Sequence, residues 1–161
     1  MKRFLSPAIP FLALTFLCFS PFPLLSDEPA GDSDAQSVAL TLWQLPNQTS
    51  TQMMSYIMKA DDGSVIVIDG GNAGDADYLV ERIRAARPDG KVAAWFLTHL
   101  HSDHVNALCR IMTEKPGAVS VESVYFHFPP MEWFEKNCTT GDPGEARHFF
   151  DAVSAFPKTA V

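Results

Sequence analysis

Apolar runs separated by short polar turns are the first pattern along this chain. Runs at 38–45 and 52–60 predict two strands, because they are rich in branched and aromatic side chains. The polar triplet Asp61-Asp62-Gly63 predicts a tight turn from the second of these strands into a third at 64–69. The first part of the folded chain is therefore expected to contain a β-hairpin.

Further along, apolar positions take on helical spacing. Tyr78, Leu79, Ile83 and Ala86 predict a helix over residues 75–87 that Pro88 ends. Strands alternating with helices indicate an α/β fold. The remaining expected elements are a strand at 91–97, a helix at 103–115, a strand at 121–128 and a helix at 144–156.

The N-terminus has the composition of a secretory signal. Lys2 and Arg3 precede an uncharged apolar run at 4–25, and small Ser26 offers a cleavage position. We expect a signal peptide at 1–26, a polar linker at 27–37 and a folded domain at 38–161, and hence a secreted or periplasmic protein. An uncut membrane anchor is the alternative, although four prolines make the run a poor permanent helix. Membrane contact is expected only through this leader.

Composition and charge narrow the choice of partners. Hydrophobic residues make up 47% of the 161 residues, which argues for a packed core. Removing Lys2 and Arg3 from the 12 basic residues leaves 10 against 19 acidic ones, a net charge of about −9. This charge weighs against nucleic acid as a partner. Cys109 and Cys138 remain after the leader, and an oxidising compartment permits them to pair, which the sequence leaves open.

The candidate metal-binding residues lie around the turn between the expected strand at 91–97 and the expected helix at 103–115. His99, His101, Asp103 and His104 place three imidazoles and one carboxylate within six residues. Side chains alternate in an extended segment, so His99 and His101 can hold one ion while Asp103 and His104 face a second. Zinc suits these ligands, and iron or manganese can use them too. The alternative is a solvated turn whose histidines cap the helix.

The run Thr98-His99-Leu100-His101-Ser102-Asp103-His104 resembles the signature of the metallo-β-lactamase fold superfamily. The upstream block at 64–71, a hydrophobic strand that ends in Asp-Gly-Gly, is similar to that family as well. The resemblance implies a four-layer αββα sandwich, of which this chain covers about the N-terminal half. We therefore expect a metallo-β-lactamase-like domain that is incomplete at its C-terminus.

The same resemblance implies roles for individual residues. His99 and His101 would bind the first metal, and Asp103 and His104 the second. Asp103 would also orient the attacking water and pass a proton to the leaving group. Two further residues would not bind metal themselves: Asp69 would act next to the ligands, and Thr98 would support the ligand loop.

The family completes its site with a third histidine, a bridging aspartate and a last histidine downstream. After His104 this chain offers only His127 and His148. His127 falls inside the expected strand at 121–128, which favours a structural role, and His148 falls in a helix. Asn106 is a further departure, since small residues or glycines often follow the motif, and it is expected to alter the pocket.

The resulting hypothesis is an exported, zinc-dependent hydrolase that directs an activated water at a carbonyl or phosphoryl centre. Its substrate is expected to be a small molecule or a phosphodiester. The family includes β-lactamases, lactonases, thioester hydrolases, nucleases and phosphodiesterases, and the sequence does not choose among them. The alternative hypothesis is a truncated or degenerate exported protein that binds metal without catalysis. The oligomeric state is left open.

Overall fold

A computed structural model describes residues 39–138, 142–154 and 159–160 of the chain. The described residues all belong to one compact unit, Ser37–Val161. The expected signal peptide at 1–26 and linker at 27–37 lie outside the described residues. Within the described part, no helix is long and apolar enough to cross a membrane.

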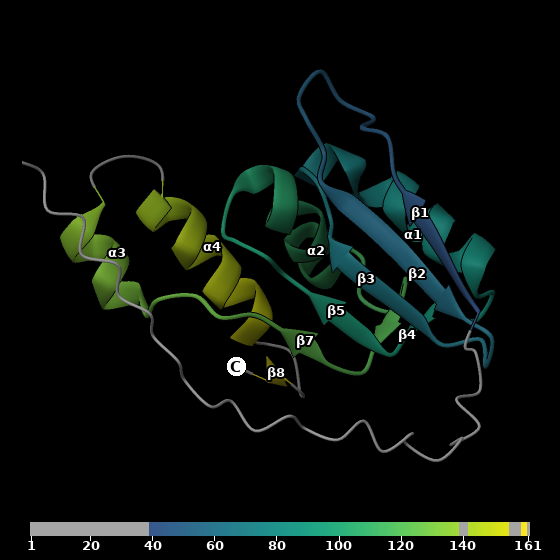
Figure 1. Cartoon of the computed structure of the whole chain (residues 1–161). Coiled ribbons are helices and arrows are strands. Elements are labelled where there is room, and N and C mark those ends of the chain that lie inside the picture. Colours follow the sequence, from purple (N-terminus) through teal and green to yellow (C-terminus); the bar gives the residue numbers. More distant parts are fainter. Residues whose placement is uncertain (1–38, 139–141, 155–158, 161) are drawn as a thin grey trace, which may run out of the picture. The chain divides into compact units, whose positions relative to one another are not determined.

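The central element is a six-stranded mixed sheet with the order β1-β2-β3-β5-β7-β8 (Figure 1). Strand β2 pairs antiparallel with β1 and with β3, whereas β3, β5, β7 and β8 run parallel to one another. A separate small sheet joins β4 (Lys91–Val92) to β6 (Ser120–Val121). The strands of the main sheet are β1 (Leu40–Gln44), β2 (Ser55–Ala60), β3 (Val65–Asp69), β5 (Ala94–Phe96), β7 (Val124–Tyr125) and β8 (Thr159–Ala160).

The expected hairpin is confirmed as β2 and β3, which pair from Ser55 opposite Asp69 onward. Its turn uses Gly63 in the left-handed region, at φ +80°, where a side chain is disfavoured. The backbone N–H of Ser64 donates to the Asp62 carboxylate at 2.7 Å, which closes the turn. Turn chemistry therefore sets the register that brings Asp69 to the end of β3.

Helices cover one face of the main sheet. Helices α1 and α2 pack against the strands, α4 packs on α2, and α3 packs on α4 (Figure 1). A short 3-10 turn at Ala73–Asp75 leads into α1. The helices are α1 (Ala76–Ala86), α2 (Ser102–Glu114), α3 (Met131–Asn137) and α4 (Asp142–Ser154).

The two faces of the sheet differ in burial. On the helix-covered face, Ile57, Val67 and Trp95 are at most 1% exposed. The opposite face is also apolar, yet Leu42 is 55% exposed and Phe96 41% exposed, and no described helix covers it. One sheet with helices on one face is half of an αββα sandwich, so the expected fold class is confirmed.

Three details of the sequence prediction are wrong. The strand at 91–97 is divided between the two sheets, and the strand at 121–128 leaves the main sheet after Tyr125. Phe126 and Phe128 instead pack their rings on Phe149 of α4, at centroid distances of 5.0 and 5.2 Å. Apolar side chains that pack against a helix from an irregular segment give the same apolar sequence pattern as the side chains of a buried strand. Helix α3, which begins directly after the proline pair Pro129-Pro130, was not expected from the sequence.

Candidate metal centre

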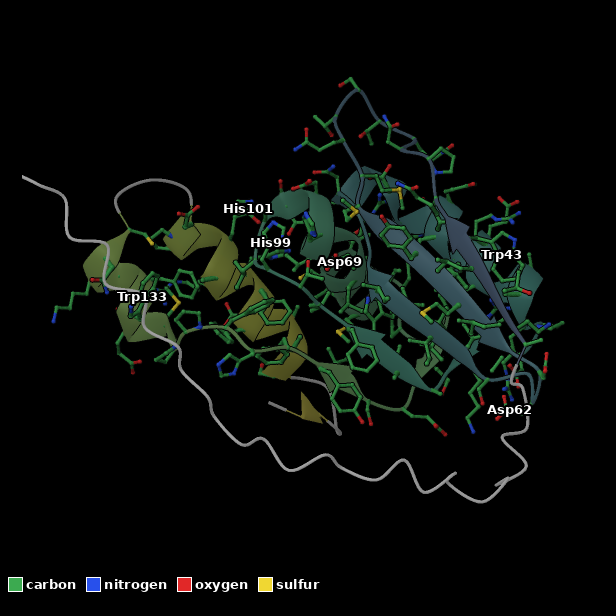
Figure 2. The ribbon with its side chains drawn as sticks, viewed as in Figure 1. Trp43, Asp62, Asp69, His99, His101 and Trp133 are labelled. Atoms are coloured by element: carbon green, nitrogen blue, oxygen red, sulfur yellow. The ribbon has the colours of Figure 1, made fainter. Side chains whose placement is uncertain are left out.

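The candidate ligands lie in the short turn between β5 and α2. Strand β3 ends at Asp69 beside β5, because these two strands run parallel with Ile68 opposite Phe96. The carboxyl ends of parallel neighbours meet at one edge of a sheet. Figure 2 shows the consequence, with His99 and His101 close to Asp69 and far from Trp43 and Asp62. The fold thus brings the signature turn and Asp69 together.

Asp69 is the buried centre of the polar contacts in this turn. Its side chain is 1% exposed and accepts hydrogen bonds from Thr98 N at 2.9 Å and Thr98 Oγ1 at 2.8 Å. His104 Nδ1 lies 2.9 Å from the same carboxylate. Asp69 itself adopts a left-handed φ of 54°, which aspartate tolerates better than most residues. Strained backbone of this kind is typical of functional sites.

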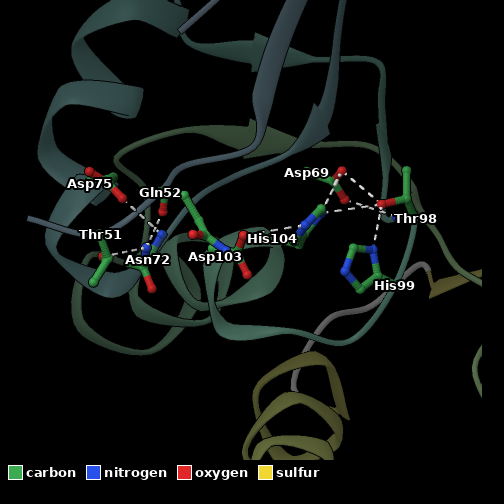
Figure 3. Close-up of polar contacts among 9 residues, drawn as sticks. All are labelled: Thr51, Gln52, Asp69, Asn72, Asp75, Thr98, His99, Asp103 and His104. Carbon is green, nitrogen blue, oxygen red and sulfur yellow. Dashed lines mark hydrogen bonds and ion pairs between the residues drawn. The ribbon is translucent and has the colours of Figure 1, made fainter. Parts of the chain in front are cut away.

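The proton positions follow from these contacts. The single hydroxyl proton of Thr98 goes to Asp69, so its oxygen is left to accept from His99 Nδ1 at 3.2 Å and His104 Nδ1 at 3.3 Å (Figure 3). We infer that both imidazoles carry their proton on Nδ1. The Nε2 lone pairs of His99 and His104 are then free for a cation, as expected for metal-binding histidines.

Asp103 and His104 have the spacing of a chelating pair. Asp103 Oδ2 lies 3.5 Å from His104 Nε2. Two ligand atoms about 2.1 Å from one tetrahedral ion lie roughly 3.4 Å apart. Asp103 stands in the first turn of α2, and its backbone carbonyl accepts from Met54 N at 3.0 Å, which holds that turn in place. This pair therefore fits the second metal position.

His99 and His101 form the other pair. Their ring centroids are 4.6 Å apart in an edge-to-face arrangement, and the His99 ring also lies 3.7 Å from that of His104. Partial burial, followed by the neighbouring imidazoles of His104 and His101, lowers the pKa of His99. A lowered pKa keeps His99 neutral near pH 7, which is the form that binds a metal.

A complete ligand set is not in place. Among the described residues, no three His, Cys, Asp or Glu side chains are positioned to hold one ion together. The donor chemistry and the Asp103–His104 spacing nevertheless fit a metal, with His99, His101, Asp103 and His104 as two pairs. Each ion would need at least one further protein ligand, because catalytic zinc sites use three.

The metallo-beta-lactamase superfamily model matches residues 51–151, well over half of the chain. The chain belongs to this superfamily. Its members bind divalent metals, usually zinc. A Thermotoga maritima protein assigned to the metallo-beta-lactamases is similar to this chain at 17% identity and a TM-score of 0.43. The match covers 77% of this chain and 58% of the Thermotoga chain. A search of curated proteins found no match to this sequence.

In this metallo-beta-lactamase superfamily member, one buried residue that the sequence analysis did not single out holds a loop beside the candidate metal site. Asp75 is fully buried, and its carboxylate accepts from Gln48 N at 2.8 Å and from Asn72 N at 2.9 Å. These bonds tie the 46–54 loop to the start of α1, and the same loop supplies Met54 N to Asp103. The spacing Asn72-x-x-Asp75, which is typical of a helix start, could have identified Asp75 from the sequence.

The lack of a side chain at Gly71 allows the 46–54 loop to pack closely against it. Its φ is +92°, and an added Cβ would lie 2.6 Å from Met53 Cγ and 2.9 Å from Asp75 Oδ2. Asn72 Nδ2 donates to Gln52 O at 2.6 Å and completes the contact (Figure 3). The block Asp69-Gly70-Gly71 thus ends strand β3, allows the 46–54 loop to pack closely against Gly71, and leads into the 3-10 turn before α1.

The other residues singled out in the sequence are now placed. His127 lies after β7 and is exposed, so the prediction that it belongs to a strand is wrong. His148 is exposed on α4, in the helix expected for it. The Oδ1 atom of Asn106 is buried and has no hydrogen-bond partner among the residues that the structure describes. Cys109 and Cys138 form no disulfide within the described part of the chain, and Cys109 is fully buried.

Proposed function

We propose that this chain is the metal-capturing part of an exported, zinc-dependent hydrolase. In this proposal His99 and His101 would hold the first ion, and Asp103 and His104 would hold the second. The observation that carries the proposal is the carboxylate of Asp69, because it accepts from Thr98 and lies 2.9 Å from His104 Nδ1. Such contacts orient a ligating imidazole and raise its basicity.

A zinc ion, when bound, supplies Lewis acidity that makes water nucleophilic near neutral pH. The side chains have separate tasks. Asp103 would orient the water by a hydrogen bond, would take its proton as the water attacks the substrate, and would pass that proton to the leaving group. Asp69 and Thr98 keep the proton of His104 on Nδ1, so that Nε2 stays available. Iron or manganese would be held by the same donors.

Substrate and location are part of the proposal. The substrate is a small molecule with a carbonyl centre or a phosphodiester, because both develop negative charge on oxygen during hydrolysis. The net charge of about −9 without Lys2 and Arg3 weighs against long polyanions. Export rests on the composition of residues 1–26, with an uncut anchor as the alternative.

A second candidate is a binding protein without catalysis. The observation in its favour is that the described residues contain no group of three His, Cys, Asp or Glu side chains able to hold one ion. Such a chain would take up metal weakly and turn over no substrate. Metal uptake and turnover therefore have to be measured separately.

The experiment is a zinc titration of the chelator-stripped chain, compared with His101→Ala and, as a matched exposed control, His148→Ala. We expect zinc uptake by the parent and the control, and loss of at least one binding step in His101→Ala. Zinc-loaded protein is then tested on ester, lactam, thioester and phosphodiester substrates. Uptake without turnover supports the binding protein, and equal uptake by His101→Ala contradicts both candidates.

A further inference from the structure

An open hollow of about 340 Å³ lies beside the histidine turn, and most of its lining is apolar. The turn contributes His99, Leu100 and His101 to one side of the hollow. Pro129, which follows β7, and two aromatic residues of α3 line other parts of it. A substrate whose reacting centre lies at the candidate metal positions would therefore have this hollow available for its remaining atoms.

The largest side chain of the hollow is Trp133 of α3 (Figure 2). Trp133 is 46% exposed, although tryptophan is highly buried on average. The next residue, Phe134, is only 7% exposed and belongs to the core, and its ring centroid lies 5.3 Å from that of Trp133. Glu135 accepts a hydrogen bond from Arg147 of α4, which also holds α3 in place. An exposed indole on an anchored helix can bind an apolar group at little conformational cost.

The charges around the hollow favour an uncharged substrate group. Among the described residues that line it, none is a lysine or an arginine. Its one carboxylate belongs to Asp142, the first residue of α4. Burial, followed by the charge of that carboxylate, raises the pKa of the Cys138 thiol, so the thiol stays neutral near pH 7. A carboxylate or phosphate in this part of the substrate would meet a like charge and find no cation, whereas an uncharged apolar group would be accepted.

We propose that the substrate of this site is an uncharged ester with an apolar acyl chain, and that this chain packs on Trp133 in the hollow. The inference rests on the proposed function and narrows its substrate class. In the reaction, water supplies a hydroxyl group to the acyl carbon, the bond from that carbon to the alkoxy oxygen breaks, and the proton of the water goes to the leaving alcohol. Trp133 takes no part in these steps and determines which acyl group is bound.

The first measurement is binding to the metal-free full chain, followed by the indole N–H resonances of its three tryptophans. The probes are 2-octanone and octanoate, because they have the same number of carbon atoms and differ in charge. We expect 2-octanone to shift the Trp133 resonance, which Trp133→Phe identifies by its loss, and octanoate to bind at least about 5-fold more weakly. The resonance of fully buried Trp95 should stay in place. Equal binding of the two probes, or no shift at Trp133, would overturn the inference.

The second measurement is hydrolysis of p-nitrophenyl hexanoate and p-nitrophenyl acetate by the zinc-loaded full chain. A fully buried methylene contributes about 4-fold in affinity, so the four additional methylenes of hexanoate should raise kcat/KM by at least about 10-fold. Trp133→Ala should reduce this preference to about 3-fold or less, and Trp133→Phe should keep most of it because an apolar ring remains. Leu40→Ala is the control, since Leu40 is an exposed apolar residue of β1 outside the hollow, and it should keep the parent's preference.

The outcomes separate this inference from the proposed function. If the parent hydrolyses esters and Trp133→Ala keeps the parent's preference, the role of Trp133 is overturned and the proposed function stands. Faster hydrolysis of bis(p-nitrophenyl) phosphate than of the hexanoate ester would likewise overturn only the substrate class. If the parent hydrolyses no substrate, both are overturned. Far-UV circular dichroism of Trp133→Ala should equal that of the parent, because the side chain is exposed.

Discussion

Replacing Asp69 with asparagine tests the polar centre of the site. Asparagine has nearly the same size and also tolerates a left-handed backbone, so Asp69→Asn removes the charge with little change of shape. The carboxylate has three close donors, Thr98 N, Thr98 Oγ1 and His104 Nδ1. An amide has one oxygen and turns an N–H toward a donor, so at least one of these contacts is lost.

The magnitude follows from the burial of that carboxylate. A hydrogen bond to a charged group contributes about 1.5–3 kcal/mol, and a buried donor left unpaired costs about 1–3 kcal/mol. Because Asp69 is 1% exposed, solvent replaces little of what is lost. We expect Asp69→Asn to lower the free energy of unfolding by about 2–4 kcal/mol, a large fraction of the stability of a small domain.

The assay is urea unfolding, followed by tryptophan fluorescence and circular dichroism. Asp77→Asn is the control, because Asp77 on α1 is 65% exposed and its ion pairs with Lys115 and Arg110 lie at the surface. The control should unfold close to the parent. An Asp69→Asn variant with the parent's midpoint and slope would refute the reasoning that Asp69 organises the turn.

The remaining predictions concern other parts of the fold. Gly71→Ala should destabilise the chain by at least about 1 kcal/mol more than Gly63→Ala in urea, because both positions have positive φ but only Gly71 would clash with its neighbours; equal losses would contradict the close approach. Burial raises the pKa of Cys109 to about 12, so alkylation near pH 8 should spare it in the folded protein and modify it in urea. Since the folded state keeps this proton while the unfolded chain loses it, stability should fall as the pH rises from about 9 to 12. The exposed apolar face around Leu42 and Phe96 predicts that the chain self-associates in sedimentation and that lysine at both positions reduces this, and a monomeric parent or unchanged association in the variant would contradict the prediction.

The sequence predicted the elements whose signals are local. The hairpin at Gly63 and the helix that Pro88 stops follow from turn and breaker residues, and the structure has both. The segment after Tyr125 was misjudged, because its aromatic residues find their partners on α4, far away along the chain. Periodicity alone cannot distinguish these two ways of burying apolar rings.

In the candidate site, too, local features could be predicted from the sequence and long-range contacts could not. The position of the 98–104 turn between a strand and a helix, and its nearness to Asp69, could be predicted from the sequence. The Asp75 contacts to the 46–54 loop and the exposure of His127 depend on which strands become neighbours, which no local pattern encodes. The assignment of individual ligands stays a prediction until metal is bound.

Zinc K-edge absorption of the stripped and reloaded chain tests the central claim most directly. Histidine and aspartate ligation predicts a shell of nitrogen and oxygen at about 2.0–2.2 Å, with the outer scattering of imidazole rings, and a reduced imidazole contribution in His101→Ala. A shell dominated by sulfur at about 2.3 Å, or a spectrum unchanged in His101→Ala, would contradict the account.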